Sequence, residues 1–376
     1  MKNGSYILLA LLSVCMLAQA GQQPNVIFVI TDDHGYSDLG AYGIADDIHT
    51  PNLDDLANNG ALMTQGYVTA PQCSPSRAGV VTGRYQNRFG FEENGDKPLP
   101  LGEITIAERM RDAGYATGFV GKWHLNPDRS SKQWIAANKD TTKDPVLNPE
   151  LVLPYRPMSR GFTDAFEGVT YNYFTTYDLE GNDVSPARAY GNKEDFRVDI
   201  QTDAALAFIK RHSDEPFFLH LAYYAPHVPC VVTEKYFSRF PGEMAERRRW
   251  ALASISAIDD GVGRIVALLK EKGIEENTVI FFFGDNGAPL KIEKKDEPFE
   301  GVQGGWNGSL NDPMVGEKGM VADGGVRVPF FVNWKGTIPA QRYEHPVISL
   351  DASATALALA GVATGEGALD GVNLMP

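Results

Sequence analysis

Two long apolar runs, each followed at once by acidic residues, constrain the fold most strongly. Residues 25–31 (NVIFVIT) and 277–284 (NTVIFFFG) are continuously apolar and rich in β-branched and aromatic side chains. Such runs are typical of central strands that are buried on both faces of a sheet. Shorter strands are predicted at residues 115–121, 216–221 and 328–332, and helices at residues 51–59, 102–113, 196–211, 246–272 and 351–360. Alternating strands and helices predict an α/β fold with a mostly parallel central sheet flanked by helices.

The stretch at residues 126–191 shows neither the period of an amphipathic helix nor that of a strand, and it is polar, aromatic and irregular. We expect it to form long surface excursions that border a site. The chain of 376 residues has a hydrophobic content of 43% and a charged content of 22%, which is ordinary for a globular protein. We therefore expect one α/β domain over residues 24–376.

The first twenty residues have the pattern of a secretory signal peptide. Lys2 supplies the positive start, residues 6–17 are apolar, and Ala18-Gln19-Ala20 forms a cleavage site between small residues. A membrane anchor is the alternative, but the apolar run is shorter than the ~20 residues that a spanning helix needs. We therefore predict a signal peptide at residues 1–20, a periplasmic or secreted protein, and no membrane span.

Charge and cysteine content limit the partners and the covalent chemistry. The formal net charge of −14 argues against binding to nucleic acid, but it leaves a small anionic substrate possible. Cys15 would leave with the signal peptide, so that Cys73 and Cys230 could form at most one disulfide. No disulfide forms if Cys73 is committed to other chemistry.

Acidic residues follow both long strands where the backbone must turn. Asp32 and Asp33 come directly after the first strand, and Asp285 and Asn286 after the second. If the two strands are parallel neighbours, these side chains meet at one edge of the sheet, where ligands bind in α/β folds. Clustered carboxylates repel one another unless a cation joins them, and oxygen ligands favour calcium or magnesium. The alternative is that they are helix caps and turn formers.

A cysteine precedes a predicted helix in residues 70–83 (APQCSPSRAGVVTG). Ser74 can cap this helix and Pro75 suits its first turn, which puts Cys73 at the helix N-terminus, where an anion is favoured. Arg77 lies one turn further on and faces the same side. A buried structural cysteine or a simple thiol nucleophile are the alternatives, and the second needs a partnered histidine base.

This segment resembles the signature of the type I (formylglycine-dependent) sulfatase family, the arylsulfatase-like branch of the alkaline phosphatase superfamily. The shared pattern is Cys-x-Pro-Ser-Arg, then an apolar pair and Thr-Gly. Other segments that resemble the family are residues 24–36, 114–124, 225–229, 284–287, 316–319, 323–329 and 370–374. Asp323 stands where the family more often has Glu. The resemblance implies the alkaline phosphatase/sulfatase-like fold.

The resemblance also implies a modification and a metal. Cys73 would be oxidised to formylglycine by a formylglycine-generating maturation enzyme, and each chain would hold one Ca²⁺. The calcium ligands would be Asp32, Asp33, Cys73 in its oxidised form, Asp285 and Asn286. The substrate would be a sulfated sugar or an aryl sulfate.

The same resemblance assigns roles to five further side chains. Lys122 and Lys318 would hold the sulfate oxygens, and His227 would protonate the departing alcohol. His124 would act as the base that releases sulfate from residue 73. Arg77 would hold residue 73 and the metal carboxylates in place.

Members of the family usually continue into a small C-terminal subdomain, which is missing from the 376 residues of this sequence. Either the sequence is truncated or this member lacks that part. The closest alternative function is that of a phosphodiesterase or phosphonate monoester hydrolase of the same superfamily. A non-catalytic carbohydrate-binding relative is a second alternative. Trp306, in a Gly-rich stretch, either lines a sugar site or lies on a surface loop.

Overall fold

The computed structural model describes residues 23–95, 97–128, 131–138, 149–191, 195–229, 231–291 and 305–375. The predicted signal peptide at residues 1–20 lies outside these ranges, and so does Cys230. In the described part, every helix is too short or too polar to cross a membrane.

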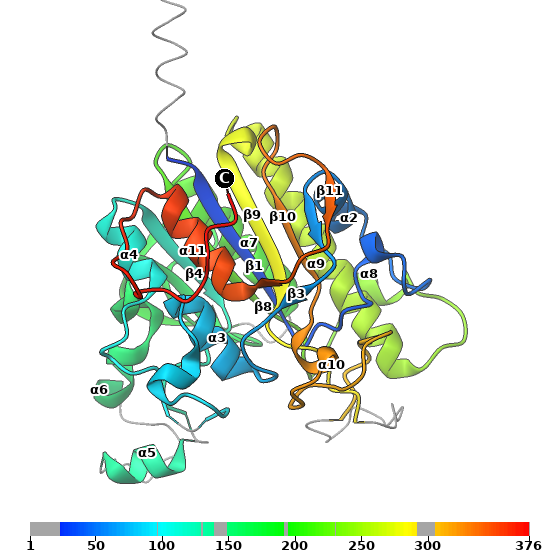
Figure 1. Cartoon of the computed structure of the whole chain (residues 1–376), viewed down its shortest axis with the longest axis horizontal. Helices are drawn as coiled ribbons and strands as arrows, with labels where there is room; N and C mark the ends of the chain where they lie inside the picture. Colours follow the sequence, from blue (N-terminus) through cyan, green and yellow to red (C-terminus); the bar gives the residue numbers. More distant parts are fainter. Residues whose placement is uncertain are drawn as a thin grey trace, which may run out of the picture.

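A ten-stranded sheet runs through the molecule in the order β11-β2-β10-β9-β1-β8-β4-β5-β6-β7 (Figure 1). Its strands are β1 (Asn25–Asp32), β2 (Ala61–Met63), β4 (Ala116–Gly121), β5 (Asp164–Gly168), β6 (Asn172–Tyr177), β7 (Asp183–Gly191), β8 (Phe217–Pro226), β9 (Thr278–Gly284), β10 (Phe330–Asn333) and β11 (Gln341–Tyr343). The centre, β9-β1-β8-β4-β5, is parallel throughout. At the edges β10 runs antiparallel to β9 and β2, and β5, β6 and β7 form an antiparallel meander. A separate two-stranded sheet pairs β3 (Gly66–Tyr67) with β12 (Val347–Ile348).

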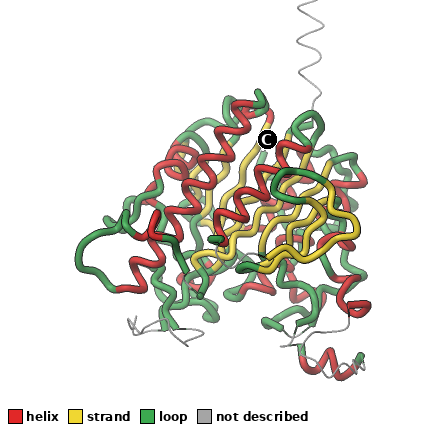
Figure 2. The backbone as a smooth tube through the Cα atoms, turned by 180° about the vertical axis from the view of Figure 1, so that it is seen from behind, coloured by secondary structure: helices red, strands yellow, loops and turns green. Residues whose placement is uncertain are grey.

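Helices cover both faces of this sheet (Figures 1 and 2). One face carries α2 (Pro51–Asn58), α7 (Arg197–Arg211) and α9 (Glu246–Glu271). The other face carries α3 (Cys73–Thr82), α4 (Ile106–Asp112) and α11 (Ser349–Leu359). Shorter helices are α5 (Lys132–Ala137), α6 (Pro149–Val152), α8 (Glu234–Phe237), α10 (Asp323–Val326) and the 3₁₀ turns η1 (Gly40–Tyr42), η2 (Gln86–Phe89), η3 (Leu153–Tyr155), η4 (Pro157–Arg160) and η5 (Glu275–Asn277).

The central strand β1 supplies both hydrophobic cores. Its side chains alternate between the two faces, as in any strand. Ile27 and Val29 pack into the core under α7 and α9, whereas Val26, Phe28 and Ile30 pack into the core under α3, α4 and α11. This explains the unbroken apolar run, because no position of the strand faces water. The predicted α/β class with a parallel centre is confirmed.

Two local predictions were wrong. Residues 126–191 do not form only surface excursions, because they contain β5, β6 and β7 of the main sheet. The strand β6 alternates buried and more exposed positions, and its buried side chains are aromatic or threonine, which hides the period in a polar sequence. In addition, α3 begins at Cys73 with Gln72 at its N-cap position, so Ser74 lies inside the first turn and does not cap the helix.

Candidate active site

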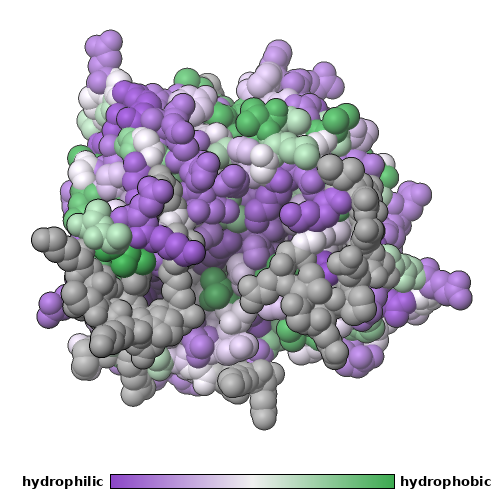
Figure 3. Space-filling model, turned by 90° about the horizontal axis from the view of Figure 1, so that it is seen from below, coloured by the Kyte–Doolittle hydropathy of each residue, from purple (hydrophilic) through white to green (hydrophobic). Residues whose placement is uncertain are grey.

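Four parallel strands of the centre end at the same edge of the sheet, and each delivers predicted site residues there. The register pairs Thr31 of β1 with Gly284 of β9, and Gly121 of β4 with Ala222 of β8. The chain then continues into site residues after every one of these strands. Figure 3 looks at the molecule from this side, and hydrophilic side chains gather around a hollow at its centre.

The acidic residues predicted from the two long strands meet at this edge. Asp32 is the last residue of β1, and Asp33 follows with a φ of 60°, a left-handed conformation that turns its side chain back toward β9. The Asp33 amide donates to Asp285 Oδ1 at 3.1 Å, and Asn286 Nδ2 donates to Asp33 Oδ1 at 2.7 Å. We call Asp32, Asp33, Asp285 and Asn286 the acidic cluster.

Part of the acidic cluster, with two neighbours, forms a donor set that fits a divalent cation. Ligand atoms of Asp32 and Asp33, and of Cys73 and His227 from outside the cluster, all lie within 4.8 Å of one another. The Oδ1 atom of Asn286 is buried and has no hydrogen-bond partner among the described residues, although buried polar atoms are normally paired. A cation bound by the carboxylates would satisfy this oxygen.

Burial and electrostatic repulsion within the acidic cluster both raise the pKa of Asp285. Burial and the nearby charge of Asp32 raise the pKa of Asp285 to about 6, although Arg77 and Lys122 act in the opposite direction. For Asp32, burial also favours the neutral acid, but Lys122, His227, Arg77 and Lys318 outweigh burial and hold its pKa well below the usual range.

Cys73, the first residue of α3, lies against the acidic cluster as a free thiol. Its Sγ atom is 3.4 Å from Asp32 Oδ1 and 3.9 Å from Asp33 Oδ1, and Lys318 Nζ lies 3.2 Å from the same sulfur. The side chain is buried, and burial raises the pKa of this thiol far above its ordinary value. As a cysteine, residue 73 is therefore a neutral thiol and a poor nucleophile.

Three buried or half-buried cationic side chains each form an ion pair with one of the three carboxylates of the acidic cluster. Arg77 donates from Nε to Asp285 Oδ2 at 2.9 Å and from Nη1 to the carbonyl of Lys122 at 2.7 Å. Lys122 Nζ lies 2.6 Å from Asp32 Oδ2, and Lys318 Nζ lies 2.6 Å from Asp33 Oδ1. Because these charges balance, an added divalent cation would leave the site positive and able to hold an anion.

The two predicted histidines follow the neighbouring strands β8 and β4 and face different carboxylates. His227 follows β8, and its Nε2 atom lies 3.6 Å from Asp33 Oδ2 while Nδ1 faces the carbonyl of Val228. His124 follows β4 with a φ of 60°, and its Nε2 atom lies 3.9 Å from Asp128 Oδ2. Burial lowers the pKa of both rings, and for His124 the charges of Lys122 and Arg77 add to the effect.

Sequence reasoning missed an aromatic side chain that connects the cations to the histidine. The Tyr224 ring, on β8, lies 4.7 Å from the His227 ring in a stacked arrangement, and Lys122 Nζ is 5.1 Å from its centroid. The guanidinium of Arg197 lies 4.8 Å from the same ring and also donates to the carbonyl of His227. Tyr224 lies beyond the strand predicted at residues 216–221, because β8 continues to Pro226, and no motif marks it, so this contact had no signal in the sequence.

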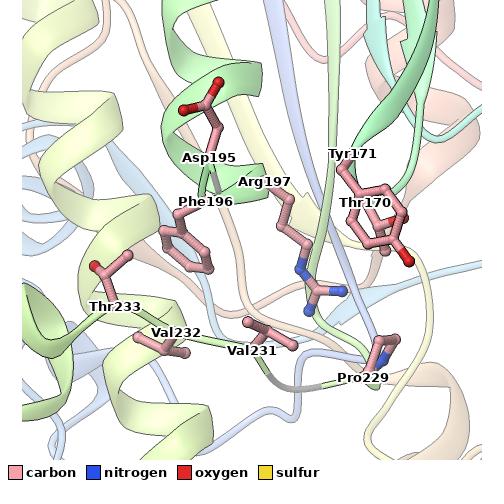
Figure 4. A pocket seen from close by; sticks show the side chains of 9 residues that line it. All are labelled: Thr170, Tyr171, Asp195, Phe196, Arg197, Pro229, Val231, Val232 and Thr233. Atoms are coloured by element: carbon pink, nitrogen blue, oxygen red, sulfur yellow. The ribbon is translucent and has the colours of Figure 1, made fainter. Parts of the chain in front are cut away.

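Arg197 also faces a second hollow, of about 250 Å³, shown in Figure 4. There its guanidinium points between Val231 and Pro229 on one side and Tyr171 on the other. The residues that line this hollow are Thr170, Tyr171, Asp195, Phe196, Arg197, Pro229, Val231, Val232 and Thr233. Arg197 thus fixes the backbone of His227 from outside the acidic cluster.

Two other side chains considered in the sequence analysis, Trp306 and His220, are buried in the packed interior. Trp306 is only 6% exposed and donates from Nε1 to the carbonyl of Ser309, so it belongs neither to a sugar-binding surface nor to an exposed loop. His220 lies in the apolar core, stacked 5.3 Å from Phe119, and burial lowers its pKa to about 3.

Fold and site together define an α/β enzyme with a metal-compatible acidic cluster and anion-binding lysines at the carboxyl edge of its sheet. The family model described as Sulfatase matches residues 24–362. The chain therefore belongs to the sulfatase family, within the alkaline phosphatase superfamily, and is a sulfuric ester hydrolase.

Individual relatives agree with this assignment over nearly the whole chain. The chain is 34% identical to the N-acetylgalactosamine-6-sulfatase of Sus scrofa, a match that covers 98% of this chain and 69% of the relative. It is 31% identical to arylsulfatase A of Bos taurus, over 95% of this chain and 68% of that protein. Among solved structures, Ps i-CgsB in complex with k-i-k-neocarrahexaose is similar with a TM-score of 0.74 and 31% identity, covering 94% of this chain and 75% of that one.

Proposed function

We propose that this protein is an exported sulfatase that removes sulfate from a sulfated carbohydrate, with a formylglycine made from Cys73 and with Ca²⁺ in the acidic cluster. The observation that carries the proposal is the position of Cys73 Sγ, between Asp32 Oδ1 at 3.4 Å and Lys318 Nζ at 3.2 Å. The similarity to proteins named as sulfatases of a sulfated amino sugar, and to a structure that contains a carbohydrate, supports a sugar substrate.

Residue 73 and the metal would supply the reactive oxygen and extra positive charge. When hydrated, a formylglycine offers two hydroxyl groups, one to attack sulfur and one whose later deprotonation allows sulfate to leave. Calcium, when bound, would add a charge next to the sulfuryl oxygens. The ligands we propose are Asp32, Asp33, oxidised residue 73, Asp285 and Asn286.

The remaining side chains would bind sulfate and move protons. Lys122 and Lys318 would hold the sulfuryl oxygens. This role is supported by the contact of the Lys122 ammonium with Asp32 and of the Lys318 ammonium with the sulfur of residue 73. Arg77 fixes Asp285 and the strand end at Lys122. His227 would donate a proton to the departing alcohol, and His124 would take one from residue 73.

The chemistry at residue 73 is tested by expressing the protein with and without a formylglycine-generating enzyme. Peptide mass spectrometry would give the modified fraction at position 73, and hydrolysis of 4-nitrophenyl sulfate would give the activity. We expect activity to rise in proportion to the modified fraction, to vanish in Cys73→Ala, and to fall when calcium is chelated. Full activity of protein that carries unmodified cysteine would overturn the proposal.

The same preparation separates this function from that of a phosphodiesterase or phosphonate monoester hydrolase. We expect kcat/KM for the aryl sulfate to exceed that for bis(4-nitrophenyl) phosphate and for phenyl phosphonate. The opposite preference would assign the protein to the other activity. Amino-terminal sequencing of the exported protein would test the proposed removal of residues 1–20 and the catalytic domain at residues 24–376.

A further inference from the structure

A hollow of about 670 Å³ shares Lys122, His124 and His227 with the proposed sulfate site. Glu167 of β5 and Phe174 of β6 also line it, so the antiparallel meander supplies part of its wall. The volume lies within the roughly 300–1,000 Å³ that small-molecule pockets occupy. The hollow is therefore large enough for the sugar ring that carries the sulfate.

The described lysine and arginine that line this hollow each face a carboxylate. Arg156 Nη1 lies 2.7 Å from Glu167 Oε2, and Lys122 lies against the acidic cluster. The rings of His124 and His227 lie 3.9 Å from Asp128 and 3.6 Å from Asp33, and burial favours the neutral form of both rings. Beyond the place of the sulfate, the described wall thus carries no net positive charge and offers no cation whose charge is uncompensated.

The pair of Arg156 and Glu167 is held rigidly by the meander. Glu167 and Phe174 stand directly opposite each other on β5 and β6, and the Arg156 guanidinium carbon lies 4.4 Å from the centroid of the Phe174 ring. The guanidinium is therefore confined between an aromatic face and a largely buried carboxylate. A guanidinium has five N–H donors, so Arg156 can donate to sugar hydroxyls while it stays paired with Glu167.

We propose that this hollow selects a sugar whose only negative charge is the sulfate ester that is cleaved, and that the Arg156–Glu167 pair sets this selectivity. A second sulfate or a carboxylate on the sugar would lose its water and approach Glu167 without gaining a free cation from the described lining. Hydroxyl and amide groups lose less on entering the hollow, and they find donors and acceptors there. The inference rests on the proposed sulfatase function and names the substrate class of that same site.

Two aryl sulfates of nearly equal shape isolate the charge. The probes are 4-carbamoylphenyl sulfate, whose leaving group is neutral, and 4-carboxyphenyl sulfate, whose leaving group carries a second negative charge. For protein with formylglycine at position 73, we expect kcat/KM to be about tenfold higher or more for the carbamoyl probe, because the carboxylate loses its hydration without gaining a cation that is not already paired. Equal rates, or a preference for the carboxylate, would overturn the inference.

Variants of the pair give an independent check. In Glu167→Gln the guanidinium loses its counter-charge, so the preference for the carbamoyl probe should shrink to about threefold or less. Arg156→Gln leaves the carboxylate alone, so the preference should grow. The double variant Arg156→Gln/Glu167→Gln is neutral again and should return toward the wild-type ratio, a rescue that general damage to the fold would not produce.

The two levels of the proposal fail in different ways. If modified wild-type protein hydrolyses neither probe and no other sulfate ester, the sulfatase function itself is wrong. If it hydrolyses both probes but ratios do not follow the charge of residues 156 and 167, only the selectivity is wrong. The wild-type ratio decides the question even if one variant fails to fold.

Discussion

Arg77 is the side chain whose geometry is hardest to replace in the site. It is buried, and its guanidinium donates at once to Asp285 and to the carbonyl of Lys122, groups that follow two different strands. A lysine ammonium at the same position cannot span both acceptors, because it is a point charge without the planar fork. We therefore expect Arg77→Lys to lower kcat/KM for an aryl sulfate by about 100-fold, the effect of a displacement of about 1 Å in a reacting group.

The comparison must be made at equal formylglycine content, measured by mass spectrometry. Arg111→Lys is a suitable control, because Arg111 is exposed and pairs only with the neighbouring Asp112 in the described part of the chain. If Arg77→Lys kept wild-type activity, the bridging role of this guanidinium would be refuted.

A second prediction at the scale of residues concerns the amide oxygen of Asn286, which has no hydrogen-bond partner in the described part of the chain. If this oxygen binds calcium, Asn286→Ala should weaken calcium binding by about 10- to 100-fold, the range seen when groups around a metal site are removed. At a fixed calcium concentration above both dissociation constants, each tenfold loss removes about 1.4 kcal/mol of the stabilisation that calcium gives. The measurement is the rise of Tm on adding calcium.

The control is Asn59→Ala, since the exposed Asn59 side chain donates only to Asp55 of α2 in the described contacts. It should keep the full calcium-dependent rise in Tm. An unchanged rise in Asn286→Ala would mean that this oxygen is not a ligand.

At the scale of elements, the end of β4 depends on a glycine. Gly121 has a φ of 99°, and a Cβ atom built on it would lie 2.0 Å from the carbonyl oxygen of Ala222 on β8. Gly121→Ala therefore combines a left-handed backbone, which costs roughly 1–2 kcal/mol, with a clash against the backbone of the neighbouring strand. The free energy of unfolding should fall by more than about 2 kcal/mol, and the displaced Lys122 should lower activity.

Gly114→Ala separates the cost of the left-handed backbone from the cost of the clash with the neighbouring strand. Gly114 precedes β4 with a φ of 90°, but a Cβ atom there would meet nothing within 4 Å. Urea unfolding should show the smaller loss for Gly114→Ala. Equal losses would mean that the neighbouring strand gives way and that the close approach at Gly121 is not needed.

The elements also show what the sequence predicts and what it hides. β1 and β9 were predicted within a residue because both faces are buried and the apolar run is unbroken. The convergence of Asp32 and Asp285 followed from the rule that parallel strands end at one edge. The strands β5, β6 and β7 were not predicted, because the buried positions of the meander hold tyrosine, threonine and charged pairs. These residues are also common in loops.

Side-chain contacts between segments that are distant in the sequence could not be predicted from the sequence. The stacking of Tyr224 on His227 and the pairing of Arg156 with Glu167 depend on how strands lie beside each other, and no local pattern records this. Motif resemblance located the residues of the acidic cluster and Cys73, but it carried no information about the wall of the hollow.

At the scale of the whole molecule, a charged cluster ties the meander to the helical layer. His212, just after α7, lies with Nε2 3.3 Å from Asp164 Oδ2 on β5 and with Nδ1 2.7 Å from Glu215 Oε1. Arg211 adds a contact of 3.0 Å to Asp164 Oδ1. Since β5 begins the meander that lines the proposed sugar hollow, this cluster connects the stability of the fold to the substrate wall.

The stability of this connection should depend on pH. Burial lowers the pKa of His212, but Asp164 and Glu215 outweigh burial and raise it above its ordinary value. A raised pKa in the folded state means that the contribution is complete below the unfolded pKa, near 6.5, and is lost as pH rises through the folded pKa. Asp164 has a lowered pKa because the cations outweigh its burial, so its contribution is lost only in acid. We therefore expect His212→Gln to reduce the free energy of unfolding by about 1.5–3 kcal/mol at pH 5.5, the range for a hydrogen bond to a charged group, and by clearly less at pH 9. Urea unfolding of both proteins at the two pH values measures this difference, and an equal loss at both would show that the ring stabilises the fold by packing on Phe208 and not by its charge.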